Sequence, residues 1–140
     1  MWGFQEYPWP PDKVARSTLI HMSNMERLQQ FALSFPEAER KDIEAWDGEP
    51  TFRVRGKNFV FTSPEATGIT VKLPIDEAAA LVASRDSVTP TGYGLGRAGW
   101  VSIELGAELS EAQWTEIAEW VEQSYRLVAP KTLVKRLDAI

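Results

Sequence analysis

The sequence predicts one α+β domain in two layers, an antiparallel sheet of about five strands with helices packed on one face. Three observations support this. The chain has 140 residues, the size of one domain, and its 44% hydrophobic and 25% charged residues are typical of globular proteins. Strand-like segments follow one another closely enough to form hairpins, and helical segments stand before, between and after them. The sheet face without helices is expected to be at least partly open to water.

Residues 1–22 are predicted to form an N-terminal arm outside the single domain at 23–140. Aromatic residues and prolines alternate in this arm: Trp2, Phe4, Tyr7, Pro8, Trp9, Pro10 and Pro11. Proline fixes φ and removes a backbone donor, so neither a helix nor a central strand is expected there.

A helix is expected to open the domain. Ser23 and Glu26 have the spacing of a capping box, and Pro36 ends the helical pattern. The apolar residues between them recur at helical spacing: Met25, Leu28, Phe31, Ala32 and Phe35. A half-exposed strand over about 37–46 is expected next, ending near Trp46.

A hairpin with Arg55-Gly56 as its loop follows. Its strands are predicted over 51–54 and 57–62. The register pairs Val54 with Lys57 and Phe52 with Phe59. It gives the core face four apolar side chains: Phe52, Val54, Phe59 and Phe61.

A third strand over 69–73 is predicted to direct Thr70 and Lys72 away from the core. Pro74 suits the first turn of an alanine-rich helix that continues to about Ser84. The glycine-rich segment 86–99 is typical of a loop.

The last strand is predicted over 100–105. Its alternation turns Trp100, Ser102 and Glu104 away from the core. A long helix begins at a second capping box, Ser110 with Gln113, and Pro130 interrupts it before a short helical turn at 132–137. Trp120 lies off the apolar stripe of this helix, so its ring is expected to be covered by the N-terminal arm, the C-terminal turn or another subunit, with cover from within the chain favoured.

The composition excludes several kinds of site. Cysteine is absent and His21 is the one histidine, so thiolate chemistry and His-rich metal sites are not expected. The acidic segment 37–49 indicates a solvated face, with weak divalent-cation binding as the alternative. No convergent carboxylate pocket is identified, so we expect a protein that is not an enzyme, without catalytic residues, metal or cofactor.

No segment is apolar enough to cross a membrane, and the N-terminus lacks the pattern of a signal peptide. A cytoplasmic protein with no membrane partner is therefore expected.

The segment Gly92-Tyr93-Gly94-Leu95-Gly96 is similar to a phosphate-binding glycine loop. A dinucleotide fingerprint needs a helix after the loop, whereas a strand follows here, and the lysine of a P-loop is missing. The segment is better interpreted as a flexible connection, with Arg97 near its end as an anion contact.

Basic residues gather on the expected open face. The net charge is −5, which argues against a general nucleic-acid binder, but residues 51–72 hold four basic residues against Glu65, a local charge of +3. Cations near an aromatic ring are the elements of a nucleic-acid surface. The candidate binding residues are Arg53, Arg55, Lys57, Lys72, Arg97 and Trp100. The alternative is a wet sheet covered by charges, with Trp100 packed under the glycine loop.

Four stretches resemble the MmcQ/YjbR family of small bacterial proteins. They are Ala32–Glu39, Phe52–Phe59, Val88–Pro90 with Gly94–Trp100, and Ser124–Lys131. The resemblance implies a CyaY-like α+β fold and a DNA-binding role, with Arg53, Lys57, Arg97 and Trp100 at the matching positions. It implies no catalytic residue, and Ala98 departs from the bulkier residue that the family often has there.

Three functions remain open from the sequence. The first is a non-enzymatic module that binds DNA or another polyanion. The second is an adaptor that binds a protein partner through its acidic face and exposed aromatic residues. The third is a small-molecule or metal-binding protein.

Overall fold

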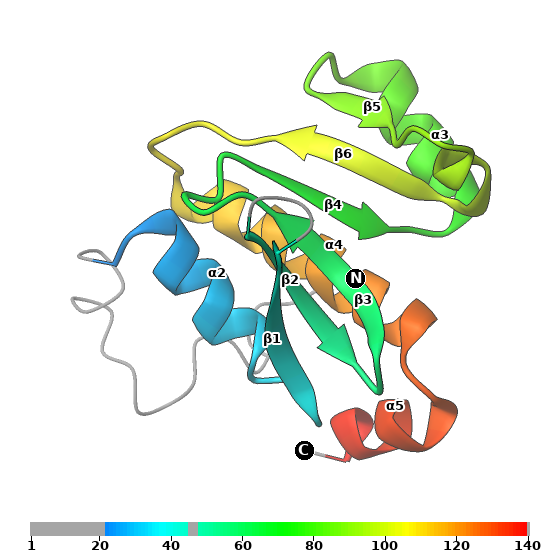
Figure 1. The fold of residues 1–140 in the computed structure, drawn as a ribbon. Helices are drawn as coiled ribbons and strands as arrows, with labels where there is room; N and C mark the ends of the chain where they lie inside the picture. Colours follow the sequence, from blue (N-terminus) through cyan, green and yellow to red (C-terminus); the bar gives the residue numbers. More distant parts are fainter. Residues whose placement is uncertain (1–21, 45–47, 140) are drawn as a thin grey trace.

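The computed structural model describes residues 22–44 and 48–139 (Figure 1). Most of the predicted arm, His21 and Trp46 lie outside the described residues. The elements in chain order are α2 (Asn24–Ala32), β1 (Ala38–Ile43), β2 (Glu49–Val54), β3 (Lys57–Thr62), β4 (Gly68–Lys72), α3 (Ile75–Ser84), β5 (Val88–Pro90), the 3-10 helix η3 (Leu95–Ala98), β6 (Trp100–Glu104), α4 (Glu111–Val128) and α5 (Lys131–Asp138).

The strands form one antiparallel sheet in the order β1-β2-β3-β4-β6-β5, which confirms the predicted α+β class. The sheet has six strands instead of about five, because β5 pairs with β6 inside the segment predicted as a loop. β5 has only three residues, so it carries no alternation to detect, and Pro90 is tolerated because the strand lies at an edge.

The helices cover one face of this sheet. α4 crosses behind β3 and β4 in Figure 1 and contributes the centre of the core. There the ring of Tyr125 stacks on Phe35 at 4.8 Å and meets the edge of Phe59 at 5.3 Å. The Tyr125 hydroxyl donates to the carbonyl of Pro36 at 2.7 Å. α4 therefore joins the sheet to the turn that follows α2.

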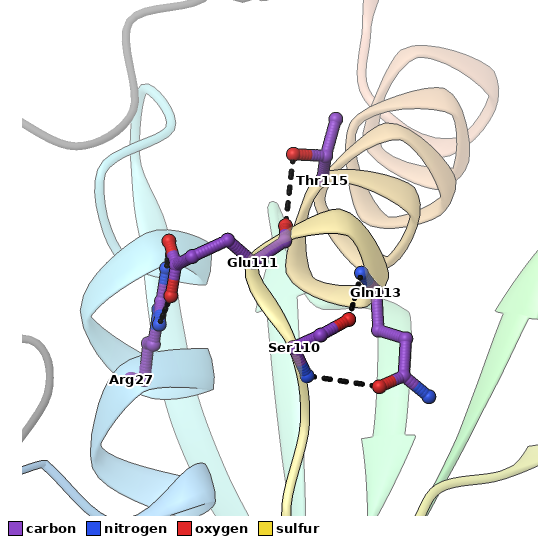
Figure 2. Close-up of polar contacts among 5 residues, drawn as sticks. All are labelled: Arg27, Ser110, Glu111, Gln113 and Thr115. Atoms are coloured by element: carbon purple, nitrogen blue, oxygen red, sulfur yellow. Dashed lines mark hydrogen bonds and ion pairs between the residues drawn. The ribbon is translucent and has the colours of Figure 1, made fainter.

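Both predicted capping boxes are confirmed. The Ser23 hydroxyl accepts from the amide of Glu26, and the Ser110 hydroxyl accepts from the amide of Gln113 (Figure 2). α2 nevertheless ends at Ala32, before the predicted limit at Phe35. The helix is closed earlier by local hydrogen bonds in which the amide and hydroxyl of Ser34 both donate to the carbonyl of Phe31.

Arg27 fastens α2 to the first turn of α4. Its guanidinium donates to both carboxylate oxygens of Glu111, at 2.8 and 2.9 Å (Figure 2). The guanidinium also lies 4.8 Å from the centroid of the Trp114 ring. The carboxylate also suits the positive end of the helix dipole. Trp120 receives the cover expected from within the chain, since the guanidinium of Arg85 lies 5.6 Å above its ring.

The predicted hairpin register is correct at the loop and wrong beyond it. Val54 pairs with Lys57, but Phe52 pairs with Val60 and not with Phe59, because a bulge shifts the register. Phe59 and Val60 are both buried, and Phe61, predicted to face the core, turns to the opposite face. Because Phe59 and Val60 are both apolar, the alternation of apolar residues could not show which of them is the extra residue of the bulge.

Candidate functional site

A row of polar side chains crosses the open face at the hairpin end of the sheet. Arg53 on β2 pairs with Asn58 on β3, and Lys72 on β4 pairs with Trp100 on β6. Directly opposed residues of an antiparallel pair share a face, and the alternate residues of these strands are buried under the helices. Three of the predicted binding residues, Arg53, Lys72 and Trp100, therefore share this face.

Ser124 connects the two halves of the row. Its hydroxyl accepts from the backbone amide of Lys72 at 2.9 Å and donates to the carbonyl of Phe59 at 2.6 Å. The ladder between β3 and β4 extends no further in this direction than the pair of Val60 with Val71. A buried side chain of α4 thus replaces the missing strand hydrogen bond and sets where Lys72 lies relative to β3.

Trp100 is half-buried and packs against Phe61. Their ring centroids lie 5.6 Å apart, and the ring planes meet at 71°. The contact spans β4, because Phe61 is opposite Thr70 whereas Trp100 is opposite Lys72. The bulge in β3 creates this aromatic pair, since it is the bulge that brings Phe61 to the open face.

Arg97 is held near the end of the row by Gly99. The carbonyl of Gly99 accepts from the amide of Leu73 at 2.9 Å, and its φ is 97°. A Cβ added there would stand 2.1 Å from the carbonyl oxygen of Leu73. This contact places η3, with the exposed Arg97, beside the residue that follows Lys72.

The arginines divide into two groups. Six form an ion pair with a carboxylate: Arg27, Arg40, Arg55, Arg85, Arg126 and Arg136. Within the described residues, Arg53 and Arg97 have no carboxylate within 4.0 Å, although Glu39 lies opposite Arg53 in register. The Arg53 Nε and the Asn58 Oδ1 are buried and have no hydrogen-bond partner there. Of the three arginines predicted from the sequence to contact a polyanion, Arg53 and Arg97 are thus the two whose guanidinium groups are not neutralised, whereas Arg55 is paired with a carboxylate.

Arg55 and Lys57 are placed differently from the row. Arg55 lies in the hairpin loop at a φ of 51° and donates to both carboxylate oxygens of Glu37, at 2.6 and 2.9 Å. Arg136 on α5 also donates to Glu37, at 3.1 Å. The hydrogen bonds from Arg55 hold the pKa of the Glu37 carboxyl below its usual value. Lys57 is exposed at the start of β3, opposite Val54, whose side chain is buried on the helix side.

A groove of about 560 Å³ continues the open face beyond the aromatic pair. Phe61 and several hydroxyl side chains line it, and the hydroxyls of Thr70 and Thr91 each lie 3.1 Å from that of Ser102. This groove was not predicted from the sequence, because serine and threonine on strands look like ordinary sheet residues. The signal available in the sequence was the alternation of these serine and threonine residues with apolar residues that are buried.

Tyr93, predicted only as part of a flexible glycine-rich connection, is a further exposed feature. It is fully exposed at a φ of 60°, and it lies between two glycines in the segment from β5 to η3. The amide of Thr91 donates to the carbonyl of Trp100, which fixes the base of this loop on β6.

The sequence matches a model of a known protein family. The model of the family described as YjbR matches residues 33–127. The chain belongs to the YjbR family. No curated protein matches the sequence.

The YjbR match contains the whole sheet, α3 and nearly all of α4, whereas α2 and α5 lie outside it. It also contains all six candidate binding residues, and Ser124 and Gly99 that position them. In the described part of this YjbR protein, no group of three or more acidic or histidine side chains could hold a metal ion. None of the described helices is long and apolar enough to cross a membrane.

Proposed function

We propose that this YjbR protein is a non-enzymatic cytoplasmic module that binds DNA through the open face of its sheet. The observation that carries the proposal is the pairing state of the arginines. Arg53 and Arg97 lack a carboxylate partner among the described residues, and they flank the cross-strand pair of Lys72 with Trp100. Cations without partners beside a half-exposed ring are what a phosphate backbone and its bases require.

The acidic net charge does not oppose this function, because binding depends on the local field. The six other described arginines are neutralised by carboxylates, so the two arginines that remain unpaired, Arg53 and Arg97, lie on the open face or at its edge. Counterion release from DNA makes such binding salt-dependent, in proportion to the number of phosphates contacted.

The test is fluorescence anisotropy with labelled DNA across a range of salt concentrations. We expect Arg53→Gln and Arg97→Gln each to weaken binding and to lower the slope of log affinity against log salt by about 1. Arg55→Gln is the matched control. It removes the same charge two residues from Arg53, but from an arginine that is already paired with Glu37.

An affinity no tighter than about 10⁻⁴ M at low salt contradicts DNA binding, since even non-specific binders reach that range at physiological salt. Equal losses in Arg53→Gln and Arg55→Gln contradict the assignment of the open face. If one protein partner binds, and its binding is unaffected by nuclease treatment and by Arg53→Gln, the result would favour the adaptor function instead.

A further inference from the structure

On β2, β4 and β6 the open face carries opposite charges at its two ends, whereas the edge strand β1 adds Glu39 opposite Arg53 and Lys41 opposite Thr51. Arg53 and Lys72 lie at the hairpin end, whereas Glu49 begins β2 and Glu104 ends β6 at the far end. Four residues separate Glu49 from Arg53 on one strand, which corresponds to about 13 Å at the usual rise per residue. A polyanion is therefore attracted at one end of the face and repelled at the other.

Between these ends β3, β4 and β6 present uncharged side chains, one of them aromatic: Phe61, Thr70 and Ser102. The groove of about 560 Å³ lies here, with Glu49 and Glu104 among its lining residues. Phe61 forms part of its wall and continues into the ring of Trp100. Hydroxyl groups that can donate or accept complete the lining: Ser63, Thr67, Thr70, Thr89 and Ser102. An unpaired nucleobase needs this combination of ring contact and adaptable hydrogen bonding.

We infer that the open face takes a single-stranded polynucleotide in preference to a duplex. The phosphates lie along Arg53, Lys72 and Arg97, and the bases pass over the pair of Phe61 and Trp100 into the groove. This inference rests on the proposed function and specifies its ligand. Single strands offer the faces of their bases to aromatic side chains, whereas a duplex keeps those faces stacked.

The acidic end gives the second reason. In a duplex the other backbone stands about 6 to 12 Å away across a groove, which is close to the separation of the basic and acidic ends of this face. The second row of phosphates would then approach Glu49 and Glu104. Like charges brought together discriminate against the wrong partner.

The experiment compares three labelled probes at low salt. They are a DNA strand of about 12 nucleotides without self-complementarity, the same strand annealed to its complement, and an RNA strand of the same sequence. We expect at least one of the single strands to bind about tenfold more tightly than the duplex. Duplex binding as tight as that of both strands would overturn the inference.

The double variant Glu49→Gln/Glu104→Gln tests the acidic end directly. Removing both charges is expected to raise duplex affinity by about tenfold while strand affinity changes little. The control, Glu77→Gln/Glu108→Gln, removes the same charge from exposed carboxylates that do not line the groove. If both double variants change the preference equally, net charge and not the groove sets it, and the inference fails.

Trp100 provides an independent test of ring contact. Trp100→Leu is expected to lower strand affinity about tenfold, and Trp100→Phe is expected to retain most of it. If Trp100→Leu does not fold, Glu49→Gln/Glu104→Gln still tests the preference for a single strand. That variant is expected to fold, because Glu104 is exposed and Glu49 is only half-buried. Failure of every probe to bind would contradict the proposed function, whereas tight duplex binding would contradict this inference alone.

Discussion

The hydroxyl of Ser124 lies 2.9 Å from the backbone nitrogen of Lys72 and accepts its hydrogen bond. Ser124 lies in the second-to-last turn of α4, and Lys72 ends β4 on the open face. The same hydroxyl donates to Phe59 on β3, so one buried oxygen holds two strands where their own ladder stops. The position of a candidate binding lysine is therefore controlled from the far side of the sheet.

Ser124→Ala should destabilise the protein by about 1–3 kcal/mol, because it leaves the buried carbonyl of Phe59 and the partly buried amide of Lys72 without this partner. Urea denaturation measures this as a lower midpoint at unchanged slope. Lys72 also loses its fixed position, so we expect the folded variant to bind DNA more weakly than the parent protein.

Ser84→Ala is the control for this change. The Ser84 hydroxyl donates to the carbonyl of Ala80, four residues back on an exposed helix turn, so its loss should cost little. Equal shifts in the two variants would show that Ser124 does not bridge the strands in solution.

Gly99→Ala should disturb the site and the fold together. The added Cβ would meet the carbonyl oxygen of Leu73 at 2.1 Å, and the φ of 97° is unfavourable for any side chain. Relief requires η3 to move away from β4, which displaces Arg97 from the end of the row. We expect a loss of about 1–3 kcal/mol in the free energy of unfolding, together with weaker DNA binding.

The matched glycine is Gly92, at the start of the same loop. A Cβ there meets nothing within 4 Å, so Gly92→Ala should leave the denaturation midpoint nearly unchanged. A Gly99→Ala variant as stable as Gly92→Ala would contradict the close approach of η3 to β4.

Local signals in the sequence predicted much of this fold. The two capping boxes were found because their partners, such as Ser110 and Gln113, stand three residues apart. The turn at Arg55-Gly56 was found for a similar reason, since apolar residues alternate on both sides of a glycine.

Features that depend on distant partners could not be predicted. The ion pair of Arg55 with Glu37 spans 18 positions, and both residues have a positive φ. The bulge that turns Phe61 outward depends on how β3 meets β2, which alternation cannot show when Phe59 and Val60 are both apolar. The candidate site was thus predicted by residue type, whereas its aromatic pair and its groove needed the structure.

Glu122 on α4 is a buried carboxylate at the junction with α5. Arg126 donates to it at 2.8 Å and reaches Asp138 at 2.7 Å. Burial raises the pKa of the Glu122 carboxyl above its ordinary value, although the hydrogen bond from Arg126 opposes this. The folded state therefore holds the Glu122 proton more tightly than the unfolded state.

Glu122→Gln should consequently remove a pH dependence of stability. A raised folded-state pKa contributes stability that is complete below the unfolded pKa and is lost as the pH rises through the folded value. Glutamine keeps an oxygen acceptor for Arg126 but does not titrate. The hydrogen bond from Arg126 lowers the pKa of the Asp138 carboxyl below its usual value, so that carboxyl titrates below the pH range compared. We expect the variant to gain stability relative to the parent as the pH rises from the ordinary glutamate pKa toward neutrality, measured by urea denaturation at each pH. Glu108→Gln on an exposed loop serves as the charge control. A difference between parent and Glu122→Gln that stays constant across this range would show that burial does not shift the Glu122 pKa.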